Sequence, residues 1–209
     1  MNEFDTKAAG WDSNPMHWDR SRAIADEIRN LIPLSKEWFA LEYGAGTGIS
    51  SFLLKDHLKE ITLMDNSPEM VRIMKEKIES SGVSNLKALH FDLEHNDYKA
   101  GKFDLIFTQM VLHHVTDVVS IIKRFNKLLN PGGYIAIADL YEEDGSFHDG
   151  TFNGHRGFDP EKLSLLLRET GFSGITVRKC YVIDRKISET ENKQFDVFLL
   201  TASMTGLPI

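Results

Sequence analysis

Short apolar runs alternate along the chain with longer segments in which apolar residues recur every three or four positions. This alternation is typical of a parallel β-sheet that is covered on both faces by helices. The apolar runs predict five core strands, at residues 38–43, 61–65, 86–91, 103–108 and 134–139. The segments between them predict the crossover helices of a doubly wound, mostly parallel α/β fold.

Two further apolar runs, at residues 175–182 and 195–202, are joined by the charged sequence DRKISETENKQ. We expect them to form an antiparallel hairpin at the edge of the sheet, which then has seven strands. The sequences Ser67-Pro68 and Asp159-Pro160 each predict a helix start, because a capping side chain precedes a proline at the first helical position. The sequence NPGG, at residues 130–133, predicts a turn.

Residues 1–209 are expected to form a single domain, since 209 residues with 42% hydrophobic content support one sizeable core. Two segments depart from the regular alternation. Residues 1–35 combine an aromatic, charged leader with one helix, and we expect them to form a helical lid. Trp11 and Trp18 either cover a ligand or only pack the N-terminal helix against the core. Residues 140–158 form a long connection rich in glycine and histidine, a length typical of functional loops, on the substrate side.

The formal net charge of −7 argues against a nucleic-acid partner, because that kind of affinity comes from lysine and arginine contacts to phosphates. Cys180 is the only cysteine, which excludes an intrachain disulfide and favours a reducing, cytoplasmic location. No apolar run approaches the roughly 18 residues that span a bilayer, so no membrane anchor is expected. We expect a monomer or a homodimer.

The sequence LEYGAGTG, at residues 41–48, places three alternating glycines directly after the first predicted strand. Ligands of open parallel sheets bind beyond the carboxyl ends of the strands, and glycine lets the backbone approach them closely. Asp65 ends the second predicted strand 21 residues after Gly44, at the place where a carboxylate accepts the hydroxyl hydrogens of a ribose. These features predict a nucleoside ligand, although glycine loops also occur as plain turns.

A nicotinamide dinucleotide fits this loop less well, because its fingerprint needs a third glycine where the chain has Ile49. The carboxylate of Glu42 also disfavours a pyrophosphate, since two like charges 4 Å apart repel by roughly 4 kcal/mol at an effective dielectric of 20. The same carboxylate favours a cationic nucleoside. S-adenosylmethionine combines a ribose, an ammonium and a sulfonium, and it has no phosphate.

Five segments resemble, in order, the motifs of class I S-adenosylmethionine-dependent methyltransferases: LEYGAGTG, LMDNSPEMV, FDLE, FDLIFTQMVLHHV and LLNPGGYIAIADL. The resemblance covers roughly residues 36–180 and is greatest to the ubiquinone and menaquinone biosynthesis type, which acts on many small molecules. It implies a Rossmann-like fold, S-adenosylmethionine as cofactor and S-adenosylhomocysteine as product. It also implies in-line transfer of a methyl group to a small-molecule acceptor.

The resemblance further implies a set of cofactor contacts. Glu42 would orient the methionine part, Asp65 would hold the ribose and Asp92 would face the adenine amino group. The whole implied set is Glu42, Gly44, Ala45, Gly46, Gly48, Met64, Asp65, Asn66, Asp92, Leu93, Thr108 and Gln109. Met64 is interpreted equally well as a core residue, and Asp92 as a strand terminator.

The acceptor side is less defined by the sequence. A sulfonium leaves as a neutral thioether without a general acid, and a base is needed only where the acceptor carries a proton. The candidates for contact with the reacting atoms are His113, His114, Asp139, His148 and His155, and those for the substrate pocket are Trp11, Trp18, Tyr141 and Phe158. His113 and His114 are interpreted equally well as surface or packing residues.

His148, Asp149 and His155 carry side chains that bind metals, but no compact ligand spacing is present, and no metal is expected. Two functions of other classes stay open. One is an S-adenosylmethionine-binding interaction module without transfer activity. The other is an NAD(P)-binding oxidoreductase, which Ile49 and Glu42 disfavour.

Overall fold

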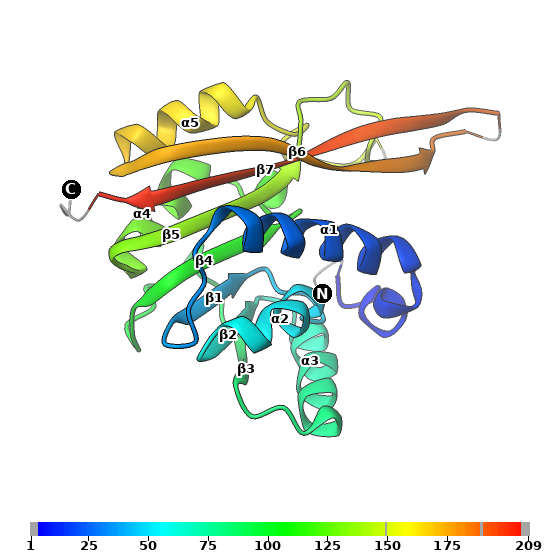
Figure 1. Ribbon diagram of the computed structural model, residues 1–209. Helices are drawn as coiled ribbons and strands as arrows, with labels where there is room; N and C mark the ends of the chain where they lie inside the picture. Colours follow the sequence, from blue (N-terminus) through cyan, green and yellow to red (C-terminus); the bar gives the residue numbers. More distant parts are fainter. Residues whose placement is uncertain (1–3, 149, 189, 206–209) are drawn as a thin grey trace.

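The computed structural model describes residues 4–148, 150–188 and 190–205 (Figure 1). One sheet is built from seven strands: β1 (Phe39–Tyr43), β2 (Glu60–Asp65), β3 (Leu86–His90), β4 (Phe103–Gln109), β5 (Leu129–Leu140), β6 (Phe172–Lys186) and β7 (Asn192–Met204). The helices of the described residues are α1 (Pro15–Leu31), α2 (Ile49–Leu54), α3 (Pro68–Ser81), α4 (Val118–Leu128) and α5 (Pro160–Glu169). Short 3₁₀ helices lie at η1 (Ala8–Ser13), η2 (Lys55–His57) and η3 (Leu112–His114).

The strands lie in the order β3-β2-β1-β4-β5-β7-β6. The first five are parallel, while β7 pairs antiparallel with both β5 and β6. This confirms the predicted doubly wound, mostly parallel sheet with an antiparallel edge hairpin. The strand order reverses between β1 and β4, and ligands of such sheets bind outside the carboxyl ends of the strands at this point.

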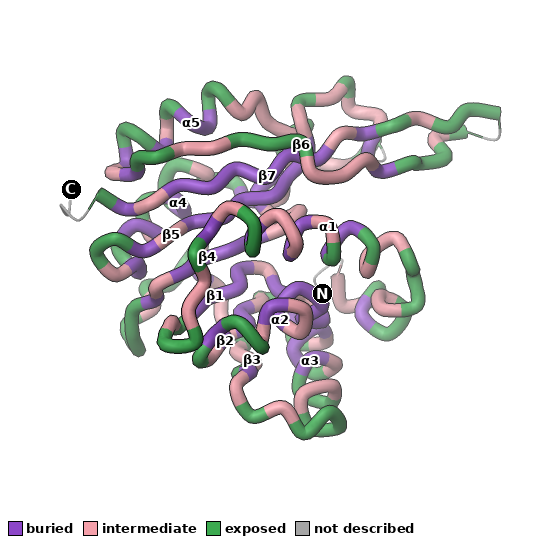
Figure 2. The backbone as a smooth tube through the Cα atoms, in the orientation of Figure 1, coloured by how far each residue is buried: buried purple, intermediate pink, exposed green. Residues whose placement is uncertain are grey.

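The core consists of two apolar layers, one on each face of the sheet. Alternate strand residues enter opposite layers: Ala40 packs with α1, α2 and α3, whereas the next residue, Leu41, packs with α4 and α5. Both residues are 0% exposed. Figure 2 shows the consequence, with buried segments concentrated in the central strands between the helices. A sheet covered on both faces explains why the strands appear in the sequence as apolar runs.

Local sequence signals place the helix starts at the carboxyl edge of the sheet. The Ser67 hydroxyl accepts the backbone N–H of Met70 at 3.2 Å, and Pro68 is the first residue of α3. The Asn14 side chain caps α1 in the same way, directly before Pro15. Asp159 caps α5 by accepting from the N–H of Glu161.

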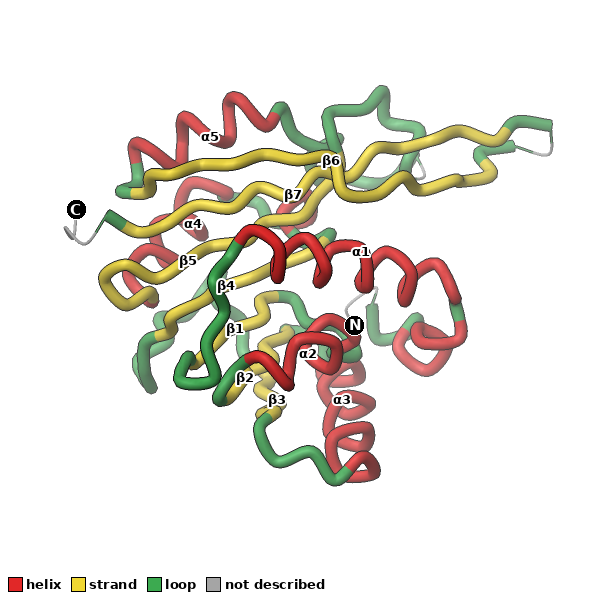
Figure 3. The backbone as a smooth tube through the Cα atoms, in the orientation of Figure 1, coloured by secondary structure: helices red, strands yellow, loops and turns green. Residues whose placement is uncertain are grey.

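Two predicted boundaries differ from the structure. The turn expected at residues 130–133 was wrong, because this segment is the irregular start of β5, where pairing with β4 shifts between Phe103 and Leu105. The edge strands are also longer than predicted, and their far ends project as a hairpin beyond the other strands (Figure 3). Over the described residues, no helix combines the length and the apolar character that crossing a bilayer requires.

Candidate functional site

A cavity of about 950 Å³ opens at the carboxyl edge of the sheet, where the strand order reverses. The loops after β1, β2 and β4 form its floor, with residues such as Gly44, Asn66 and Met110. The leader and the connection between β5 and α5 form its sides, with Trp11 and Phe152. The volume lies at the upper end of the usual range for small-molecule sites, so the cavity has room for two ligands.

The loop after β1 presents bare backbone to the cavity. Gly44 and Gly46 have φ angles of +66° and +57°, which side chains rarely adopt. A Cβ on Gly44 would lie 2.4 Å from a methyl group of Val111, so only glycine fits. The N–H of Gly46 donates to Oδ2 of Asp65 at 2.7 Å, which fastens the glycine loop to the end of β2.

Asp65 lines the cavity at the position where a carboxylate that binds a ribose is expected. Its other oxygen, Oδ1, accepts the N–H of Ser67 at 2.8 Å. Burial raises the pKa of Asp65, and the backbone N–H groups of Ser67 and Gly46 oppose that rise. A carboxylate has about four acceptor positions, so two backbone donors leave room for the two hydroxyl groups of a ribose.

Asp92 and Leu93 line the cavity beyond the end of β3. The Asp92 carboxylate accepts the N–H of Glu94 at 3.0 Å and contacts the His95 ring at 2.8 Å. Leu93 is buried, and its backbone lies beside Asp92. This turn offers an acceptor side chain and backbone groups to the cavity, and its contact with the adenine base stays a prediction.

Glu42 lies beneath the cavity rather than in its lining. Its Oε2 accepts the Ser51 hydroxyl at 2.5 Å and the Ser51 N–H at 3.1 Å, which fastens the start of α2 to β1. Burial raises the pKa of Glu42 to about 7, and the Ser51 hydrogen bonds oppose that rise. Near neutral pH Glu42 therefore carries only part of the charge that the sequence argument assigned to it. Its role towards the methionine part of the cofactor stays a prediction.

The other residues of the implied cofactor set divide by position. Gly44, Ala45, Gly46, Asp65, Asn66, Asp92, Leu93 and Gln109 line the cavity, whereas Glu42, Gly48, Met64 and Thr108 do not. Met64 is 0% exposed and belongs to the core layer shared with α4. Gln109 ends β4 and donates to the Ser21 hydroxyl of α1 at 2.7 Å. The backbone around Met64 and Thr108 still shapes the edge, but their side chains point into packed layers.

His113 forms the best-defined polar contact on the acceptor side. Its Nδ1 lies 2.6 Å from Oδ1 of Asp139, and its backbone N–H donates to Oδ2 of the same carboxylate at 3.2 Å. Both residues are buried, at 1% and 0% exposed, and Asp139 lies behind the cavity wall. Because an ionised carboxylate only accepts, we assign the hydrogen to Nδ1 of His113, which leaves Nε2 as the acceptor nitrogen.

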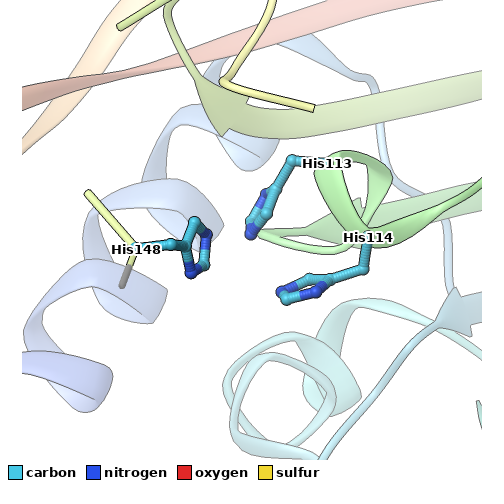
Figure 4. A group of neighbouring side chains, drawn as sticks. All are labelled: His113, His114 and His148. Atoms are coloured by element: carbon cyan, nitrogen blue, oxygen red, sulfur yellow. The ribbon is translucent and has the colours of Figure 1, made fainter. Parts of the chain in front are cut away.

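The other candidate histidines differ in their contacts. His114 and His148 lie near the His113 ring, with ring centroids 4.2 and 5.1 Å away, and all three line the cavity (Figure 4). His155 lines the cavity too, but its Nε2 contacts the backbone oxygen of Val115 at 3.1 Å and so holds the loop. Asp149 lies outside the described residues.

Four residues were predicted for the substrate pocket, and only Trp11 lines the cavity. The Nε1 of Trp18 donates to the backbone oxygen of Asp12, which turns this ring towards α3. Tyr141 forms a β-bridge with Phe158 where the connection after β5 starts and ends. Trp18, Tyr141 and Phe158 therefore support the walls, and their contact with an acceptor stays a prediction.

The leader crosses the cofactor edge of the cavity. Asp12 pairs with Lys77 of α3 at 2.6 Å and accepts the Thr47 hydroxyl at 2.5 Å. Near the chain start, Asp5 accepts the Ser67 hydroxyl at 2.6 Å. These contacts lay Trp11 over the glycine loop, with its Nε1 3.9 Å from the position of a Cβ on Gly46. The placement agrees with a lid, and opening of that lid stays a prediction.

Sequence reasoning missed several residues of the cavity, and two of them carry an unusual feature. Arg20 of α1 is 6% exposed, and burial lowers its pKa to about 10; its Nε has no hydrogen-bond partner among the described residues. The signal was present, because Arg20 interrupts an apolar stripe of helical spacing between Met16 and Ile24. The second is Met110, whose φ of +55° is rare for a side-chain residue and which turns the chain after β4 into the cavity.

Comparisons with known proteins agree with this geometry. A family of methyltransferase domains matches residues 41–137, the segment that contains the glycine loop, Asp65 and Asp92. A methyltransferase of Schizosaccharomyces pombe is 24% identical over 77% of this chain and 64% of its own length. A malonyl-[acyl-carrier protein] O-methyltransferase of Ilyobacter polytropus is 32% identical over 83% of this chain and 59% of its own length.

A solved structure has the same fold. The N-methyltransferase NodS of Bradyrhizobium japonicum, in complex with S-adenosylhomocysteine, superposes with a TM-score of 0.66 and 20% identity over 90% of this chain and 87% of that chain. The chain spans less than two thirds of the curated relatives described above. Neither the matched domain nor this fold favours the nicotinamide alternative. The matched domain, the cofactor edge and the shared fold agree: residues 41–137 match a methyltransferase domain, and the chain has the fold of the class I S-adenosylmethionine-dependent methyltransferases.

Proposed function

We propose that this protein transfers a methyl group from S-adenosylmethionine to a small-molecule acceptor. The observation that carries the proposal is the single cavity that joins the cofactor edge to a second compartment lined by His113, His114 and His148. The cofactor fills only one end, because its ribose and base are expected at Asp65 and Asp92. The remaining space is lined by side chains of η3 and of the connection after β5, and it suits a compact acceptor.

The residues present fit the cofactor. The glycine loop leaves space for a methionine chain against bare backbone, and Asp65 retains acceptor positions for the ribose hydroxyls. Bound S-adenosylmethionine supplies an electrophilic methyl group on a sulfonium that leaves as a neutral thioether. The protein therefore needs chiefly to align the acceptor with that methyl group and to exclude water, and positioning of this kind accounts for much of the rate.

Arg20 adds a charge requirement. A buried guanidinium whose Nε has no partner among the described residues favours an anionic group in the cavity. S-adenosylmethionine brings one carboxylate, and an anionic acceptor would bring another. The acceptor atom differs among the relatives, since one is an O-methyltransferase and another an N-methyltransferase. We therefore leave the acceptor atom out of the proposal.

The test follows the methyl group. The protein is incubated with methyl-labelled S-adenosylmethionine and a metabolite extract, and small molecules are separated from protein and nucleic acid before counting. We expect label in a small molecule, and its loss with Asp65→Ala, which removes the ribose contact. If S-adenosylhomocysteine binds but no fraction gains label, the protein is an interaction module rather than a transferase.

A further inference from the structure

Three histidine side chains from two distant segments meet in the acceptor compartment. His113 and His114 belong to η3, directly after β4, and His148 belongs to the connection after β5. One ring nitrogen from each lies within 4.8 Å of the others. Figure 4 shows the three rings turned towards a common space between them. Imidazole nitrogen is the ligand that zinc, copper, nickel and iron prefer over calcium and magnesium.

The contact of His113 with Asp139 is a second, independent observation. Histidines that bind metals almost always donate their other ring N–H to a carboxylate or a backbone oxygen. In His113 this other nitrogen is Nδ1, held 2.6 Å from a carboxylate that is 0% exposed. Asp139 thereby fixes both the tautomer and the orientation of the ring, and Nε2 is the nitrogen left to bind a ligand.

The third ring is also fixed from outside the cluster. His148 stacks on Phe152, with ring centroids 3.7 Å apart and planes inclined by 18°. Phe147 packs edge-on against the other side of His148 at 4.9 Å. Aromatic packing alone accounts for these ring contacts. It does not account for a buried carboxylate that holds one of the three rings through Nδ1.

We propose that His113, His114 and His148 bind one divalent transition-metal ion of the zinc type. Zinc–nitrogen bonds of 2.0–2.1 Å place the nitrogens of a tetrahedral site about 3.3 Å apart, so the three nitrogens must move together by up to roughly 1.5 Å. Rotation of the His114 side chain, together with a small shift of the connection that carries His148 and its aromatic neighbours, supplies this movement. Three histidines leave the fourth position open, as in catalytic rather than structural zinc sites.

The charges around the cluster favour an anionic fourth ligand. Asp139 offsets part of the charge of the ion, while Arg20 and Arg185 line the same cavity and add positive charge. A cation in this setting is best neutralised by an oxygen or sulfur anion in the open position. This step rests on the proposed function: the acceptor would bind the ion through its reactive atom. His113 then acts as a metal ligand and not as a general base.

The experiment uses cobalt(II) alone as a probe, without cofactor or acceptor, so that its result is independent of methyl transfer. Purified protein is stripped with a chelator and titrated with cobalt while the visible absorption is recorded. We expect one equivalent to bind and to give the strong bands of a four- or five-coordinate ion. Zinc should displace it, because zinc binds such sites more tightly.

Four variants locate the ion. His114→Ala and His148→Ala should each weaken cobalt binding by on the order of a hundredfold or more. Asp139→Asn should weaken it by about 10- to 100-fold, the usual effect of a carboxylate that orients a ligand histidine. His155→Gln, in the same connection but bonded to the backbone of Val115, is the matched control and should bind as the wild type does. Circular dichroism checks that each variant is folded.

Two outcomes overturn the proposal. One is the absence of stoichiometric cobalt binding by the wild-type protein. The other is binding that persists unchanged in folded His114→Ala and His148→Ala, which would place the ion elsewhere. Loss of methyl transfer alone would not bear on the ion, and loss of cobalt binding alone would leave the cofactor site intact. The two proposals therefore fail separately.

Discussion

The two ends of the cavity are built in different ways. The cofactor end uses backbone groups and short loops, since Gly46 and Ser67 donate to one carboxylate, Asp65, and each lies directly after a strand. The acceptor end uses side chains from segments far apart in the sequence: Arg20 of α1, His113 of η3 and His148 of the connection after β5.

The difference also explains how the two ends tolerate buried charge. At the cofactor end, backbone N–H groups oppose the rise in the pKa of Asp65. At the acceptor end, burial lowers the pKa of Arg20, the charge of Asp139 opposes that lowering, and Nε of Arg20 has no hydrogen-bond partner among the described residues. Substitutions should therefore separate the two ends.

The largest expected effect concerns Glu42, beneath the cofactor end. Its folded pKa of about 7 exceeds the usual value of about 4.3, so folding favours the protonated form. Its contribution to stability is full below pH 4 and is lost as the pH rises to about 7. Glu42→Gln should remove this loss, and the free energy of unfolding of the variant relative to the wild type should rise by about 3 kcal/mol between pH 4 and 8.

Urea unfolding of both proteins at several pH values measures this difference, and other carboxylates cancel in the comparison. Asp56→Asn is the control, because this carboxylate is exposed and pairs with Lys55 at the surface. A pH-independent difference between Glu42→Gln and the wild type would show that folding leaves the pKa of Glu42 unchanged, which would contradict this prediction.

Asp65 is the centre of the cofactor end. Asp65→Ala should weaken binding of S-adenosylhomocysteine by 1.5–3 kcal/mol, the usual range for charge-assisted hydrogen bonds. Isothermal titration calorimetry measures the affinity, and circular dichroism confirms the fold. Asp65→Asn should have a smaller effect, since its amide retains one acceptor oxygen. Unchanged affinity in the folded alanine variant would remove Asp65 from the site.

Arg20 links the two ends. Arg20→Met keeps the apolar stem and removes the charge, and it should weaken binding of S-adenosylhomocysteine by about 1.5 kcal/mol if the guanidinium receives the methionine carboxylate. Binding of 5′-methylthioadenosine, which lacks that carboxylate, is the control and should not change. Equal binding of both ligands by the variant and the wild type would instead assign Arg20 to the acceptor.

The leader should have the smallest effect on cofactor binding. Deletion of residues 1–13 ends directly before the cap of α1 and removes the contacts of Asp12 with Thr47 and Lys77. We expect S-adenosylhomocysteine affinity to fall by less than about tenfold, or 1.4 kcal/mol, because the glycine loop and Asp65 remain. Methyl transfer should fall much further, since water enters the cavity. Full turnover of the deleted protein would refute a lid.

The sequence predicted the strands and the loops that border the proposed cofactor end, because these elements depend on local order. Alternating apolar runs defined the strands, and the spacing from Gly44 to Asp65 placed a carboxylate beside the glycine loop. The charge of Glu42 could not be predicted from the sequence, because it depends on how deeply the side chain is buried. Glu42 lies beneath the cavity, and burial raises its pKa to about 7, so it carries less negative charge than the sequence argument assumed.

The acceptor end was predicted only as a set of residue types. Nothing in the spacing of His113 and His148 indicates that a connection of the chain folds back to bring their rings to 5.1 Å. The same fold-back separates His155, which sequence reasoning grouped with His148. The sequence shows Arg20 as a charged residue within an apolar stripe. That its side chain lines the cavity depends on how α1 packs, which the sequence does not indicate.

The central claim is that one cavity holds the cofactor at one end and the acceptor at the other, and a crystal structure of the complex with S-adenosylhomocysteine tests it most directly. The account predicts ribose hydroxyls within hydrogen-bond distance of Asp65, the base beside Asp92 and the sulfur facing His113. A ligand bound with its ribose away from Asp65, or with its sulfur turned away from the three histidines, would contradict it.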